Sequence, residues 1–187
     1  MASTPNPTHP PVRFETAERV WRLVVDEADR GRAGPEQVRL ACVLTLARAT
    51  GGRARVGELQ QITVDDVDPG AGTVGVWHAR PGPAAGSRYL RTYPLDDASL
   101  TVLGWWLQAR ERVMHGPIEG DRVRALFVTV RAAHKPDGTL YHVGMPIHPR
   151  GMQQSWDRLV GRLNARHVGE DGFPLPRRFE QMRRAWR

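Results

Sequence analysis

Residues 49–68 decide the fold of this chain, and they read ATGGRARVGELQQITVDDVD. A largely apolar helix, predicted over residues 36–49, runs into this stretch. The helix must end at Gly51-Gly52, because glycine reaches backbone conformations that other residues avoid. Two arginines and a short predicted helix follow the glycines, so the stretch places positive charge at a tight turn between two helices.

The composition favours a polyanionic partner. The chain has 187 residues and a formal net charge of +7, with 27 basic side chains of which only Lys135 is lysine. Guanidinium groups bind phosphate with two parallel hydrogen bonds, which an ammonium group does not do. Nucleic acid is therefore the first partner to test, although a GC-rich coding sequence is an equally good explanation of the arginine content.

Other classes of protein are disfavoured. Cys42 is the only cysteine, so no intramolecular disulfide can form, and we expect it to be a small buried residue. The seven histidines show no metal-binding spacing, so we expect no metal and no cofactor. No apolar run approaches the ~20 residues of a membrane span, and the N-terminus has no signal-peptide core. We expect a cytoplasmic protein without a membrane partner.

The pattern along the chain predicts an α+β fold, mainly α-helical with a small antiparallel β-sheet. Residues 1–13 contain four prolines and are expected to be a disordered arm, whereas 14–187 are expected to form one domain. The predicted helices begin near Thr16, Glu36, Glu58, Asp96, Pro149 and Arg177, and the predicted strands cover 72–78, 87–95 and 126–130.

Several short motifs, taken in order, resemble the catalytic domain of the tyrosine recombinases, also called phage integrases. Arg55 stands three residues before Glu58-Leu59, as an arginine does before Glu-Leu in that family. The stretch 91–95 is similar to the family's Arg-x-Val-Pro-Leu strand, and Leu126-Phe127 to its short Leu-Phe strand. Residues 180–186 resemble its His-x-Leu-Arg-Arg-Thr-Trp box. The resemblance covers residues 14–187 and implies the fold of that domain.

The resemblance also implies a chemistry. In that family a tyrosine hydroxyl attacks a DNA phosphate and forms a phosphotyrosine. Two arginines stabilise the charge that grows on the phosphate oxygens, while a hairpin lysine and a histidine transfer protons. The arginines of this sequence that match are Arg55, with Arg53 as the alternative, and Arg183. They would hold the phosphate.

The residues that match the catalytic residues of that family form an incomplete set. Glu180 stands where the family has its histidine, three residues before Arg183. A carboxylate there repels phosphate, and it can pair with Arg183 or Arg184 at helical spacing. We therefore hypothesise that Glu180 neutralises the pocket. The hairpin lysine is absent, and Arg88 or Arg91 would replace only its charge.

The nucleophile is missing as well. In the family it follows the second arginine by several helical turns, whereas here the sequence ends four residues after Arg183. Tyr89, Tyr93 and Tyr141 all come earlier and are expected to be structural. The chain is therefore expected to be a truncated catalytic domain that binds DNA but is unable to cleave it alone.

The sequence is compatible with two functions. In the first, the chain binds DNA in recombination or integration, alone or with a full-length recombinase or a second copy of itself. In the second, it is a protein–protein accessory module or a partner-complemented subunit, with an apolar groove open where a last helix would lie. For the first function, the predicted DNA contacts are Arg53, Arg88, Arg91, Arg150 and Arg158.

Overall fold

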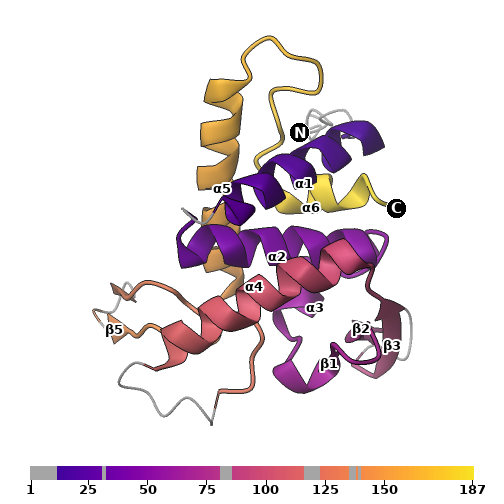
Figure 1. The fold of residues 1–187 in the computed structure, drawn as a ribbon, viewed down its shortest axis with the longest axis vertical. Helices are drawn as coiled ribbons and strands as arrows, with labels where there is room; N and C mark the ends of the chain where they lie inside the picture. Colours follow the sequence, from indigo (N-terminus) through magenta and orange to yellow (C-terminus); the bar gives the residue numbers. More distant parts are fainter. Residues whose placement is uncertain (1–11, 31–32, 81–85, 116–122, 135–137, 139) are drawn as a thin grey trace, which may run out of the picture.

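The computed structural model describes residues 12–30, 33–80, 86–115, 123–134, 138 and 140–187 (Figure 1). The predicted arm at 1–13 therefore lies almost wholly outside the described residues. The helices are α1 (Phe14–Asp29), α2 (Pro35–Ala49), α3 (Val56–Gln60), α4 (Asp97–Met114), α5 (Pro149–Arg166) and α6 (Phe179–Arg184). The strands are β1 (Val67–Asp68), β2 (Thr73–Ala79), β3 (Arg88–Pro94), β4 (Ala133–His134) and β5 (Leu140–Tyr141). The predicted class, mainly helical with a small antiparallel sheet, is confirmed.

Helix α2 is the centre of the core. Every residue from Val38 to Ala47 is buried, which agrees with the largely apolar pattern of this segment. The buried charge of Arg39 is hydrogen-bonded, since its guanidinium donates to the Val128 carbonyl and to Ser155. Helices α1, α4, α5 and α6 surround it (Figure 1). Cys42 is fully buried here as a free thiol, and burial raises its pKa. A helix covered on all sides fixes the positions of whatever begins at its end, which here is the Gly51-Gly52 turn.

Charged side chains tie the outer helices to α2. The Arg48 guanidinium lies 4.3 Å from the Trp21 ring centroid and donates hydrogen bonds to Glu18 of α1 (3.0 Å) and to Asp96 (2.9 Å). Asp96 also caps α4 by accepting from the Ser99 amide. Its hydrogen bonds with Ser99 and Arg48 hold the Asp96 pKa at about 2 despite burial. These contacts join α1, α2 and α4 at the end of α2 that leads into the turn.

The three-stranded sheet has the order β1-β2-β3 and is antiparallel throughout. Trp77 pairs with Leu90 and His78 with Tyr89, so the alternation expected for 87–95 is present. Val74, Val76 and Tyr93 are buried on the inner face, whereas Trp77 and Leu90 are exposed on the other. The pairing places β3 beside β2. We call residues 51–55, which follow α2 and carry Arg53 and Arg55, the arginine turn.

One predicted element is wrong, and another is shorter than predicted. Residues 126–130 do not form a strand, because their backbone groups pair with two different segments through isolated bridges. Leu126 donates to Ile62, while Phe127 accepts from Ile147 and Val128 bridges Pro146, which has no amide hydrogen to extend a ladder. The last helix, predicted over 177–187, is limited to α6, since Arg178 is extended at its start.

The turn after α2 depends on its two glycines. Gly51 and Gly52 have φ angles of 56° and 62°, in the left-handed region that disfavours side chains. A Cβ atom on Gly52 would lie 2.3 Å from the main-chain oxygen of Arg183, and one on Gly51 would lie 3.6 Å from that of Trp186. The turn therefore packs against the main chain of α6, which only a residue without a side chain permits.

We predict that Gly52→Ala destabilises the protein by about 2–4 kcal/mol, because it adds backbone strain to a steric overlap. Urea unfolding measures this change. Gly104→Ala is the control, since Gly104 lies within α4 and its new Cβ would meet no atom within 4 Å. That change should stabilise the protein by about 0.5–1 kcal/mol. Similar effects of the two substitutions would contradict the close packing of the turn.

Candidate functional site

Arg53 and Arg55 flank a buried residue of the turn. Ala54 has no exposed surface, so the chain directs both neighbouring arginines outward, where they are exposed. Arg55 is the residue immediately before α3. Neither arginine forms an ion pair with any residue that the structure describes. Both guanidinium groups are consequently available to an external anion.

Glu58 fixes the backbone beside these arginines. Its Oε2 accepts from the Arg55 amide (2.8 Å) and contacts His78 Nδ1 (3.1 Å), and its Oε1 accepts from the Ala79 amide (3.1 Å). His78 Nε2 lies 2.8 Å from the Tyr93 hydroxyl. A single carboxylate thus joins the arginine turn to β2, and the imidazole extends the network to β3.

This network perturbs two acidic groups. Burial by itself raises the pKa of Glu58, but hydrogen bonds from the Arg55 and Ala79 amides and from His78 outweigh it, so the pKa lies below its ordinary value. Burial also raises the pKa of Tyr93, against the opposing charges of Arg91 and Arg53. The lowered pKa keeps Glu58 ionised and able to accept these hydrogen bonds, and the raised pKa keeps the Tyr93 hydroxyl protonated. This arrangement positions the turn and does not activate the phenol as a nucleophile.

Helix α6 approaches the same turn from the other side. The Glu180 carboxylate accepts from the Val56 amide through Oε1 (2.9 Å), and its Oε2 binds Arg183 Nε (2.8 Å) and Nη2 (2.6 Å). The side chain of Arg183 is only 4% exposed, whereas that of Glu180 is 37% exposed. Residues more than 120 positions apart therefore meet at one carboxylate, beside Arg55.

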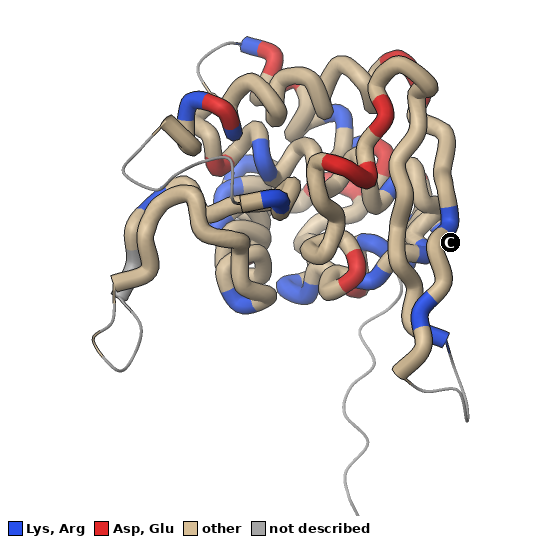
Figure 2. The backbone as a smooth tube through the Cα atoms, turned by 90° about the horizontal axis from the view of Figure 1, so that it is seen from below, with Lys and Arg blue, Asp and Glu red and all other residues tan. Residues whose placement is uncertain are grey.

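The remaining predicted DNA-contact residues lie on different elements. Arg91 stands over the Tyr93 ring at 5.1 Å, and Arg88 donates to Gln61 just after α3. Arg150 is exposed in the first turn of α5. The lower edge of Figure 2 carries mainly basic positions, including those around the hairpin. Arg88 and Arg91 are thus joined to the arginine turn through β3 and its contacts, whereas Arg158 is not.

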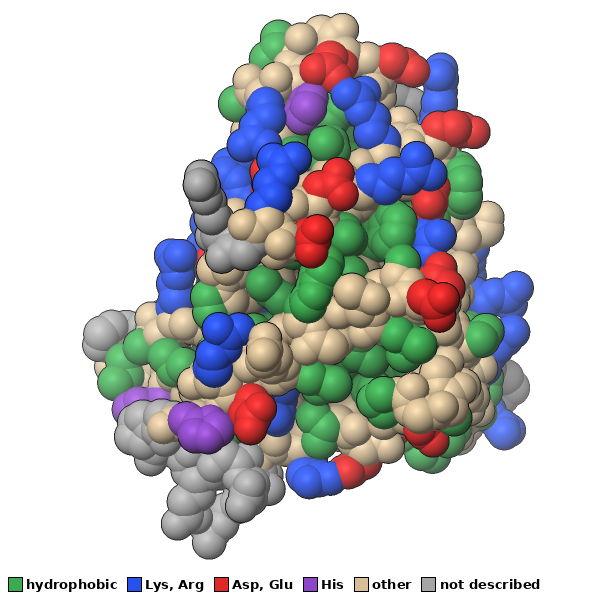
Figure 3. All heavy atoms as spheres, in the orientation of Figure 1, with side chains coloured by type: hydrophobic (Ala, Val, Ile, Leu, Met, Phe, Trp, Pro, Cys, Tyr) green, Lys and Arg blue, Asp and Glu red, His purple; other side chains and the backbone are tan. Residues whose placement is uncertain are grey.

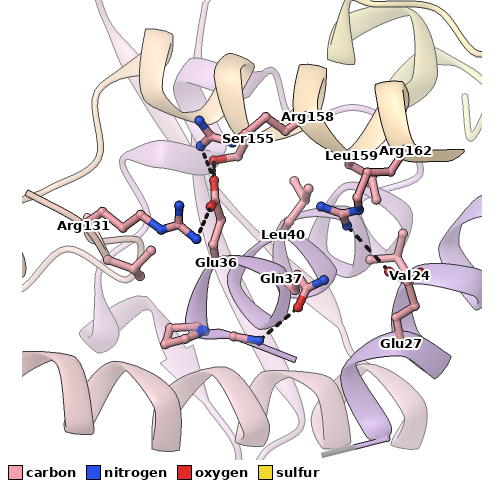
Figure 4. A pocket seen from close by; sticks show the side chains of 13 residues that line it. Val24, Glu27, Glu36, Gln37, Leu40, Arg131, Ser155, Arg158, Leu159 and Arg162 are labelled. Atoms are coloured by element: carbon pink, nitrogen blue, oxygen red, sulfur yellow. Dashed lines mark hydrogen bonds and ion pairs between the residues drawn. The ribbon is translucent and has the colours of Figure 1, made fainter. Parts of the chain in front are cut away.

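Arg158 lines a separate pocket of about 340 Å³ among α1, α2 and α5 (Figure 4). It binds Glu36, which also accepts from Ser155. Further along α5, Arg162 and Arg166 pair with Glu27 of α1. Basic and acidic side chains accordingly alternate over this part of the surface (Figure 3). The pocket lies at the start of α2, and the arginine turn at its end.

Sequence reasoning missed the role of His78 and Tyr93. The only signal was their inward register on the two predicted strands, which also fits ordinary core residues. It did find both arginine segments and the unusual Glu180. Within the described ranges, no cluster of three or more His, Cys, Asp or Glu side chains is arranged to hold a metal ion, and no helix is long and apolar enough to cross a bilayer.

Comparison with known proteins gives a likeness in fold. No protein-family model matches the chain, and no curated protein matches it in sequence. Among solved structures, XerA recombinase matches with a TM-score of 0.51 and 20% identity, over 83% of this chain and 44% of that one. The Tn1549 transposon integrase in complex with transposon right-end DNA matches with a TM-score of 0.58 and 17% identity, over 98% of this chain and 54% of that one. The chain thus spans about half the length of these proteins and has the tyrosine recombinase fold that its motifs predicted.

We predict that Glu58→Gln removes an acid-sensitive part of the stability. Because the folded-state pKa of Glu58 is lowered, its contribution is complete above the unfolded value of 4.5 and is lost as the pH falls through the lower folded value. At pH 7 the variant should be less stable by about 1–3 kcal/mol, and it should lose less stability than the wild type on acidification below pH 4.5.

Urea unfolding between pH 7 and pH 3 measures this difference. Glu111→Gln provides the control, since Glu111 is exposed on α4. It should follow the wild-type curve. Parallel pH dependence for Glu58→Gln and the wild type would show that Glu58 is not the buried acceptor described above.

Proposed function

We propose that this protein binds DNA through the face formed by the arginine turn, the hairpin and the start of α5, in a recombination or integration process. The observation that carries the proposal is that the turn bearing Arg53 and Arg55 packs against α6 through Gly52 and the Val56 amide, in a fold shared with recombinases. One protein with this fold, the Tn1549 transposon integrase, has been solved in complex with transposon right-end DNA. The proposed phosphate contacts are Arg53, Arg55, Arg88, Arg91 and Arg150.

Arg158 is left out of this set for a physical reason. Its guanidinium is bound to Glu36, so a phosphate would have to compete with an existing counter-ion. Arg53 and Arg55 have no such competitor among the described residues. Arg55 remains our choice for the principal contact, since Glu58 fixes its backbone and its neighbour Val56 contacts Glu180.

We also propose that this chain does not cleave DNA by itself. The hydroxyl groups of two of its three tyrosines are already engaged: Tyr93 with His78, and Tyr141 with the carbonyl of Pro146. Tyr89 is on the hairpin, with its ring 5.4 Å from His78. We take Tyr89, which pairs with His78 in the sheet, to be structural as well. Cleavage would then require a tyrosine supplied by a partner, which keeps a full-length recombinase or a second copy among the proposed partners.

DNA binding should weaken steeply with salt. Five phosphate contacts predict a slope of about −4.5 in a plot of log affinity against log salt concentration, and Arg53→Ala/Arg55→Ala should reduce the slope to about −2.7. Fluorescence anisotropy with a labelled duplex measures both values. Arg158→Ala is the matched control and should leave the slope unchanged. Salt-independent binding, or no binding at low salt, would refute the proposed function.

A suicide substrate with a nicked strand tests cleavage. We expect no covalent protein–DNA adduct on a denaturing gel with this chain alone. Tyr89→Phe, Tyr93→Phe and Tyr141→Phe provide the decisive comparison. An adduct that disappears in one of the three variants would identify a nucleophile and overturn this part of the proposal.

A further inference from the structure

We propose that Glu180 is an internal ligand of Arg183: its carboxylate occupies the place of an incoming oxyanion, and a phosphate must displace it to reach that arginine. The proposal rests on the proposed function only in taking a DNA phosphate as the natural competitor. It means that the protein holds this part of its binding face closed until a phosphate arrives.

The contacts of Glu180 are those that a phosphate would make. One oxygen binds two nitrogens of the same guanidinium group, at 2.8 and 2.6 Å, and the other accepts from the Val56 amide at 2.9 Å. Arginine binds carboxylate and phosphate with the same planar donor geometry. Both ligands need the same donors, so they exclude each other.

The difference in burial determines which partner moves. Arg183 is 4% exposed, and its main-chain oxygen lies against Gly52, so it is fixed. Glu180 is 37% exposed and can turn toward solvent, where Arg184 is exposed four residues further on. Displacement therefore moves a carboxylate toward water and leaves the guanidinium in place.

Arg183 also retains an unused donor. Its Nη1 atom is buried and has no hydrogen-bond partner among the residues that the structure describes. A single carboxylate satisfies only one edge of a guanidinium group, whereas a phosphate has more acceptor oxygens to offer. Glu180 therefore leaves the buried guanidinium incompletely paired, and buried donors are costly to leave unpaired.

Glu180→Gln tests the proposal without DNA. A glutamine amide is uncharged and has one acceptor atom, so it cannot accept from both Val56 and Arg183. The buried guanidinium loses its counter-ion, and the melting temperature in sodium chloride should fall by roughly 10 °C. Inorganic phosphate at matched ionic strength should restore at least half of that loss. The wild type, measured in both salts, gives the general stabilising effect of phosphate, which is subtracted.

Two variants serve as controls. Glu170→Gln removes a carboxylate that binds Arg19 at the surface. Its melting temperature should fall little in sodium chloride and should show no additional response to phosphate. Glu180→Gln/Arg183→Met removes the buried charge as well, and the response to phosphate should disappear. If Glu180→Gln unfolds in chloride, cooperative unfolding regained in phosphate supports the proposal equally.

The outcomes separate this inference from the proposed function. An equal fall in the melting temperature of Glu180→Gln in chloride and in phosphate, or no folding of this variant in either salt, would overturn the internal-ligand proposal. This holds even if the wild type binds DNA. Recovery in phosphate without DNA binding by any variant would support the internal ligand and contradict the proposed function. With both correct, Glu180→Gln should bind duplex DNA about tenfold more tightly than the wild type.

Discussion

The contact between Gly52 and the main chain of α6 is the constraint on which the candidate site depends. A side chain at position 52 would overlap the Arg183 carbonyl oxygen, so the turn and the helix approach as closely as two main chains can. This approach brings the Glu180 carboxylate within 2.9 Å of the Val56 amide. The two arginine segments, far apart in sequence, thereby become one site through backbone contact and not through a flexible side-chain pair.

The Glu58–His78–Tyr93 network fixes the same turn from the side of the sheet. Glu58 accepts from the amides of Arg55 and Ala79, so the turn is joined to β2 by main-chain groups. With α6 on one side and β2 on the other, the backbone at Arg55 has little freedom. Charged groups on a fixed backbone lose less entropy when they bind, which suits recognition of a rigid phosphate backbone.

Local patterns were sufficient to predict most elements. The largely apolar run of α2, the paired glycines and the alternation of β3 are each visible in neighbouring residues alone. The unpredicted features depend on distant partners. Whether residues 126–130 form a strand is decided by Ile62 and Pro146, and no local pattern reveals that Glu180 bonds to Val56, 124 residues away. The motif showed that Glu180 was unusual, but only the fold shows what it binds.

The distribution of ion pairs bears more directly on the proposed binding face than the net charge does. The formal charge of +7 is spread over the whole chain, and the arginines of α5 suggest a basic helix. Glu27 and Glu36 form ion pairs with three of those arginines, so their two negative charges offset part of the positive charge of that surface. The two carboxylates at the arginine turn have other partners. Glu58 binds backbone amides and His78, and Glu180 binds Arg183. Neither Arg53 nor Arg55 forms an ion pair with these carboxylates, so a phosphate that approaches the two arginines displaces no counter-ion from them.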